Sequence, residues 1–125
     1  MRKLIKSFGY AFKGISVASL DQLNIKIHWL AVIIVTIAGF FFHISITEWC
    51  LVIICFSTVL AAELFNSASE TIVDLVSPDH HPLAGKAKDI AAGAVLVTAI
   101  GAALVAFLIF WKYLMAFLGL KELIF

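Results

Sequence analysis

Three long apolar stretches restrict the fold of this 125-residue chain more than any other feature of its sequence. Residues 27–46 are almost uninterrupted by charge, and residues 48–76 and 86–118 contain comparable runs. A helix of ~20 apolar residues, rising about 1.5 Å per residue, crosses the ~30 Å hydrocarbon core of a bilayer. The composition agrees, since 63% of the residues are hydrophobic and only 14% are charged. We therefore predict an all-α integral membrane protein with three transmembrane helices in a single domain.

Residues 1–22 have a different pattern, which predicts a helix that lies on the membrane surface. Apolar residues recur at helical spacing on one face, namely Leu4, Ile5, Phe8, Ala11, Phe12 and Ile15. Lysines at positions 3, 6 and 13 lie toward the other face, as in helices that bind anionic lipid surfaces. A cleaved signal peptide is the competing interpretation. The apolar segment is too long for one, and no small-residue cleavage site precedes the next polar residues.

Two polar breaks separate the predicted spans and indicate the topology. Residues 43–48 form a short break in which Thr47 could cap the next helix, and residues 77–85 form a loop with two prolines. Seven of the nine basic residues lie before the first span or just after the second break: Arg2, Lys3, Lys6, Lys13, Lys26, Lys86 and Lys88. The positive-inside rule therefore places the N-terminus and the 77–85 loop in the cytoplasm.

A polar stripe on the second span is the strongest candidate for a functional site. Glu63, Asn66, Glu70 and Asp74 occupy relative positions 0, 3, 7 and 11. At about 100° per residue they fall within an arc of roughly 80° on one helix face. Carboxylates inside a membrane are costly and normally face a bundle interior or an aqueous cavity. The alternative, ordinary solvated residues on an emerging helix, suits Glu70 and Asp74 but suits Glu63 poorly.

The spacing of the two glutamates allows them different roles in chemistry on a phosphate. The outer carboxylate, Glu70, can bind a magnesium ion that carries nucleotide phosphates, and the deeper Glu63 can take a proton from an alcohol. Asn66 lies between them and can orient either group. Just past the loop, Lys88 offers a cation to phosphate oxygens, and Asp89 can bind ribose or hold that lysine.

These segments resemble the bacterial diacylglycerol kinase family, which includes the undecaprenol kinases. The similar blocks are residues 9–14, 63–74 and 81–89, and the resemblance extends over nearly the whole chain. It implies a homotrimeric helical bundle in the bacterial cytoplasmic membrane, with each protomer preceded by a surface helix. It also implies a lipid kinase that transfers the γ-phosphoryl group of ATP, with Mg²⁺ as cofactor, to a lipid hydroxyl. No Walker phosphate-binding loop is expected, and residues 85–87 do not form one.

The resemblance also implies a role for each candidate residue. Glu63 corresponds to the catalytic base, and Asn66 supports it. The positions that the family uses around the nucleotide are Lys3, Tyr10, Gln22, Glu70, Asp79, His81, Lys88 and Asp89, with Asp74 in a supporting role. The expected metal ligands are Glu70 and Gln22. The family commonly has a glutamate at position 22, and an amide oxygen ligates magnesium more weakly than a carboxylate.

Two other classes of function were weighed against the kinase. The four histidines would suit a metal transporter, but no pair has the i, i+4 spacing of a helical chelate, and His28 and His43 are expected at the interfaces. A small non-enzymatic membrane subunit explains the hydrophobicity but gives no reason for the polar stripe. The outer halves of the spans are almost free of charge, which favours an enzyme over a conduit. Nucleic acid is not an expected partner.

The lipid substrate stays open between two candidates. Diacylglycerol and undecaprenol both present a primary hydroxyl at headgroup depth, and an apolar helix surface suits either tail. Residues 24–28 and 81–82 look more like the undecaprenol kinase branch, so the resemblance favours undecaprenol. The sequence leaves open the stability of the trimer and the consequence of Gln22.

Overall fold

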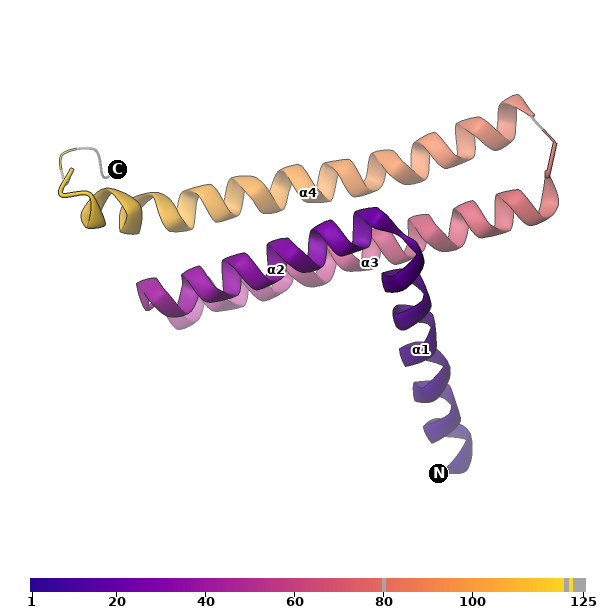
Figure 1. The fold of residues 1–125 in the computed structure, drawn as a ribbon, viewed down its shortest axis with the longest axis horizontal. Helices are drawn as coiled ribbons and strands as arrows, with labels where there is room; N and C mark the ends of the chain where they lie inside the picture. The colour runs from indigo at the N-terminus through magenta and orange to yellow at the C-terminus, as the bar shows by residue number, and fades with distance from the viewer. Residues whose placement is uncertain (80, 121, 123–125) are drawn as a thin grey trace.

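The computed structural model describes residues 1–79, 81–120 and 122, and these residues form four long helices (Figure 1). The helices are α1 (Arg2–Asp21), α2 (Leu23–Phe42), α3 (Ile46–Val76) and α4 (Pro82–Phe117). The last three are each long and apolar enough to cross a membrane. The predicted helical membrane protein, with three spans after an N-terminal helix, is therefore confirmed. His80, in the predicted 77–85 loop, lies outside the described residues.

α1 turns away from the three spans at Gln22, where the backbone is extended (Figure 1). None of the described residues of α1 is buried by the rest of the chain. Apolar side chains such as Phe8 and Phe12 are therefore available to a membrane surface, as expected for a surface helix. The turn between the helices is held by a hydrogen bond of 3.1 Å that the Trp29 indole N–H donates to the Ser19 hydroxyl.

The spans begin and end at other residues than predicted, because the residues that cap a helix set where it begins and ends. α2 begins at Leu23 and ends at Phe42, four residues before each end of the predicted range 27–46. His43 follows in the left-handed conformation, with a φ of 52°. Ser45, and not Thr47 as expected, caps α3. Its hydroxyl accepts the backbone N–H of Glu48, whose carboxylate accepts the backbone N–H of Ser45.

α4 begins at Pro82, four residues before the predicted span 86–118, and it ends at Phe117. Proline is favoured at the first position of a helix, because the N–H that it lacks has no partner there. His81 is the N-cap, and its Nδ1 accepts the backbone N–H of Leu83 at 3.2 Å. The imidazole at the tip of the loop is therefore held by the helix that it begins.

α3 and α4 form an antiparallel hairpin, and α2 lies along α3 (Figure 1). The main apolar core lies at the end of this hairpin that is remote from the 77–85 loop. It contains the buried residues Ile44, Val52 and Ile109, with Val35, Phe42, Trp49, Phe56, Val105, Phe110 and Tyr113 packed around them. The polar stripe lies in the other half of the hairpin, toward the loop.

Glu48 brings a buried charge into this remote end. It is only 8% exposed. Its carboxylate lies 2.7 Å from Lys112 Nζ and accepts a 2.8 Å hydrogen bond from the Tyr113 hydroxyl. The expectation that the outer halves of the spans are almost free of charge overlooked this pair. These contacts join the start of α3 to the end of α4, at the end of the hairpin that is remote from the connecting loop.

We predict that removing either charge of the Glu48–Lys112 pair destabilises the hairpin. Glu48→Gln should lower the free energy of unfolding by about 1–3 kcal/mol, because Lys112 loses a charge-assisted hydrogen bond, and Lys112→Met should lower it as well, because the buried Glu48 loses its cationic partner. Thermal unfolding in detergent micelles measures this loss. Lys6→Met is the matched control, since Lys6 is exposed on α1. Equal stability of Lys112→Met and Lys6→Met would contradict the prediction.

Candidate functional site

The polar stripe runs along the half of α3 that leads to the 77–85 loop, and its burial changes from one end to the other. Glu63 is 2% exposed and Asn66 is 7% exposed. Glu70 is half-buried and Asp74 is exposed. The solvated interpretation therefore fits Asp74 but not Glu63. A carboxylate as deeply buried as Glu63 is costly unless other groups compensate for the lost water.

Glu63 lies where α2, α3 and α4 meet. Its Oε1 is 3.2 Å from Nε2 of His28, which α2 places opposite it. The two side chains line a pocket of about 250 Å³. The residues that line this pocket are Asn24, Ile27, His28, Glu63, Asn66, Ala92, Val95, Leu96 and Ala99. A buried carboxylate that faces an open pocket beside a polar amide is an arrangement suited to accepting a proton.

Asn66 connects Glu63's pocket to Glu70. Its Nδ2 donates a 3.0 Å hydrogen bond to Glu70 Oε1, one turn further along α3. Its Oδ1 is buried and has no hydrogen-bond partner among the described residues, and the same holds for Ser67 Oγ. Buried polar atoms without partners are rare in folded proteins. Asn66 lines the pocket that contains Glu63, and its free Oδ1 is therefore a candidate contact for a group bound there.

A second and larger pocket, of about 760 Å³, lies between α1 and α3. It brings Tyr10 and Gln22, both predicted as nucleotide contacts, to the side of α3 that carries Ser67. Its full lining is Tyr10, Ala11, Lys13, Gly14, Ile15, Val17, Ala18, Asp21, Gln22, Leu64, Ser67, Ala68 and Thr71. Sequence reasoning did not select Ser67, although a small polar residue beside Asn66 in a membrane helix was a usable signal.

A third pocket, of about 270 Å³, lies at the loop end of the hairpin and contains four of the predicted residues: Asp74, Asp79, His81 and Lys88. Lys88 Nζ lies 2.5 Å from Asp74 Oδ1. The lysine side chain is 38% exposed and the aspartate side chain 65%, so solvent weakens the pair. Asp74 nevertheless directs the ammonium group of Lys88 toward the pocket, where an anion could bind it.

Some predicted residues are not brought together in the described part of the chain. Lys3 and Asp89 are exposed and line none of the three pockets. Among the described residues, no group of three or more His, Cys, Asp or Glu side chains could hold a metal ion. The pairing of Gln22 with Glu70 as metal ligands therefore stays a prediction. The Glu70 carboxylate and the Asn66 Oδ1 are oxygen donors that fit magnesium, which commonly uses few protein ligands and keeps waters or phosphates.

His28 lies in the candidate site, which the sequence did not predict. We expected it to be only interfacial, but the structure places its imidazole against Glu63. The one sequence signal for this contact is that His28 is a polar side chain in an apolar stretch, at a depth comparable to that of Glu63. The periodicity of α2 alone could not show which of the other helices His28 faces.

Comparisons with known proteins agree with these features. The model of the prokaryotic diacylglycerol kinase family matches residues 9–110. Undecaprenol kinase of Bacillus subtilis is 39% identical over 110 residues, which cover 88% of this chain and 89% of that protein. Diacylglycerol kinase of Helicobacter pylori strain 26695 is 34% identical over 122 residues, covering 92% and 87%. Diacylglycerol kinase of Escherichia coli K12 is 28% identical over 111 residues, covering 89% and 91%.

We predict that Asn66→Asp destabilises the protein. The substitution replaces a donor to Glu70 with a second carboxylate at i, i+4, so a hydrogen bond is lost and two like charges meet. The free energy of unfolding should fall by about 1–3 kcal/mol in thermal unfolding of the detergent-solubilised protein. Ala87→Asp, at an exposed position near the loop end of α4, is the control. If both variants unfold alike, the Asn66–Glu70 hydrogen bond is not a significant contact.

Proposed function

The chain belongs to the prokaryotic diacylglycerol kinase family and is a lipid kinase, and we propose that it transfers the γ-phosphoryl group of ATP to a membrane lipid with Glu63 as general base. The observation that carries the base assignment is the burial of Glu63, 2% exposed, against a pocket between three apolar helices. A lipid alcohol can approach such a pocket from the bilayer. Water, which would compete as an acceptor, is less abundant there.

In the proposed step, the lipid hydroxyl lies beside the Glu63 carboxylate, which takes its proton as the oxygen attacks the γ-phosphorus. The bond between the γ-phosphorus and the β,γ-bridging oxygen breaks, and ADP leaves with the negative charge. The products are a lipid phosphate monoester, ADP and a protonated Glu63, which returns its proton to solvent. Asn66 keeps its amide next to the reacting group and at the same time orients Glu70.

The nucleotide is proposed to lie between Glu63 and the loop end of the hairpin. Lys88, held by Asp74, neutralises phosphate charge, and Asp79 and His81 line the same pocket. Glu70, with the Asn66 Oδ1 and Gln22, would hold Mg²⁺. When bound, Mg²⁺ supplies charge neutralisation at the phosphate oxygens. Lys3, Tyr10 and Asp89 are proposed nucleotide contacts from the surface helix and the start of α4.

We propose that the protein works as a homotrimer in the bacterial cytoplasmic membrane, with the N-terminus and the site on the cytoplasmic side. The distribution of Lys and Arg supports this orientation. Three glycines of α4, Gly85, Gly93 and Gly101, would each have no atom within 4 Å of an added Cβ. Small residues that face open space within one protomer suit close packing against a second copy in lipid.

The proposed acceptor is undecaprenol, or a polyprenol alcohol of the same kind, with diacylglycerol as the second candidate. The similarity to the protein named undecaprenol kinase is 39% over 110 residues. The two diacylglycerol kinases compared above are 34% and 28% identical, but the diacylglycerol kinase of Synechocystis is 40% identical over 103 residues, which cover 59% of that protein. Overall identity therefore does not separate the two lipids. The preference for undecaprenol rests on the resemblance of residues 24–28 and 81–82, and both lipids belong in the same assay.

Phosphoryl transfer from labelled ATP in lipid micelles with Mg²⁺ tests the proposed function. Undecaprenol and diacylglycerol are offered separately, and we expect transfer to undecaprenol at the higher rate. Glu63→Gln should lower transfer to the level of the blank, because the base is gone while the side-chain volume is kept. Glu122→Gln, at an exposed position, is the matched control and should retain activity. Substantial transfer by folded Glu63→Gln would remove Glu63 from the base role.

A second prediction concerns Lys88. Lys88→Met should raise the KM for ATP by about tenfold or more, because the phosphates lose a cationic partner. A factor of ten corresponds to about 1.4 kcal/mol of binding free energy. The KM for the lipid should stay close to that of the wild type. Lys86→Met is the control, since Lys86 is exposed two residues away on the same helix. Equal ATP KM values for the two variants would exclude Lys88 from phosphate binding.

A further inference from the structure

The imidazole of His28 lies beside Glu63, the residue that the proposed reaction uses as its base. Its Nε2 lies 3.2 Å from Glu63 Oε1, across the interface between α2 and α3. The His28 side chain is 21% exposed, whereas that of Glu63 is 2% exposed. A carboxylate at that depth needs a hydrogen-bond donor to compensate for lost water. The imidazole of His28, on a neighbouring helix, lies close enough to serve as one.

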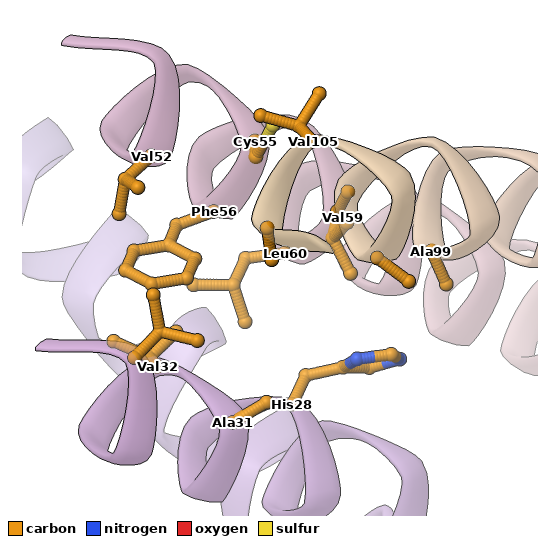
Figure 2. A pocket seen from close by; sticks show the side chains of 14 residues that line it. His28, Ala31, Val32, Val52, Cys55, Phe56, Val59, Leu60, Ala99 and Val105 are labelled. Atoms are coloured by element: carbon orange, nitrogen blue, oxygen red, sulfur yellow. The ribbon is translucent and has the colours of Figure 1, made fainter. Parts of the chain in front are cut away.

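His28 also stands at the boundary between two cavities of different character. The pocket that contains Glu63 and Asn66 has a volume of about 250 Å³. A further cavity of about 170 Å³, not described above, also lies among α2, α3 and α4 (Figure 2). Apart from His28, its lining is almost wholly apolar and includes Val52, Phe56 and Leu60. His28 and Ala99 line both. The imidazole is therefore a polar group set between an apolar chamber and the buried carboxylate.

We propose that His28 is the positioning residue for Glu63, and this inference rests on the proposed function. The Nε2–H of His28 donates to Glu63 Oε1 and fixes the plane of the carboxylate. Oε2 is then left to accept the proton of the lipid hydroxyl in the 250 Å³ pocket. Since His28 acts through Glu63, it is not itself a catalytic residue. Without it, the carboxylate can rotate away from the acceptor oxygen.

Two substitutions of His28 separate this role from simple packing. In His28→Ala the donor is lost, and we expect kcat to fall by about 10²-fold, the size of effect that a small misplacement of a reacting group can have. In His28→Gln the amide nitrogen is the same number of bonds from the backbone as Nε2, so the donor is kept. That variant should recover kcat to within about threefold of the wild type. The KM for ATP should not change in either variant, because His28 lies outside the proposed nucleotide pocket.

A control and a spectroscopic measurement accompany the kinetics. His43→Asn replaces the exposed histidine at the far end of α2, where asparagine tolerates the left-handed backbone, and should leave kcat unchanged. In ¹⁵N spectra of histidine-labelled protein in micelles, the His28 imidazole signal is identified by its absence in His28→Gln. That signal should shift in Glu63→Gln, whereas the His43 signal should not.

The outcomes distinguish this inference from the proposed function. An inactive wild type, or an active Glu63→Gln, overturns the proposed function, while the ¹⁵N shift still reports on the His28–Glu63 contact. If the wild type is active, Glu63→Gln is inactive and His28→Ala retains full kcat, the positioning role of His28 is overturned and the proposed function stands. A His28→Gln variant as impaired as His28→Ala would also overturn it, as would an unchanged His28 signal in Glu63→Gln.

Discussion

A carboxylate inside a membrane-spanning helix has to be paired or hydrogen-bonded, because the surrounding hydrocarbon offers no water to replace its hydration. α3 carries two such carboxylates, and they meet this requirement in different ways. Glu48 is surrounded by Ser45, Lys112 and Tyr113. Glu63 has His28 at 3.2 Å and faces an open pocket. The first carboxylate has several donors and joins α3 to α4, whereas the second faces the pocket in which we propose that the reaction occurs.

This difference separates the two ends of the hairpin of α3 and α4. The apolar core and the Glu48 contacts lie at the end remote from the 77–85 loop. Toward the loop the stripe becomes progressively more exposed, from Glu63 to Asp74. A lipid alcohol and a water-soluble nucleotide can therefore approach the same helix face from opposite directions. In the proposed reaction, the γ-phosphoryl group would lie between the lipid alcohol and the rest of the nucleotide.

The sequence predicted the parts of the structure that depend on local pattern. Apolar length predicted the three spans, and helical spacing placed Glu63, Asn66, Glu70 and Asp74 on one face of α3. Those inferences needed only one helix at a time. The prediction that Thr47 caps α3 was wrong, because Ser45 is the N-cap and forms reciprocal hydrogen bonds with Glu48. The contacts of His28 with Glu63 and of Glu48 with Lys112 join different helices, so no periodicity within one helix could show them.

The central claim is that lipid and nucleotide meet at Glu63, and a structure of the protein with a lipid alcohol and a non-hydrolysable MgATP analogue tests it most directly. The account predicts the lipid oxygen within about 3 Å of a Glu63 carboxylate oxygen, the reach of a general base. It also predicts the γ-phosphate analogue on the side of that oxygen that leads to Lys88. A lipid oxygen bound elsewhere, with Glu63 contacting neither ligand, would contradict the account.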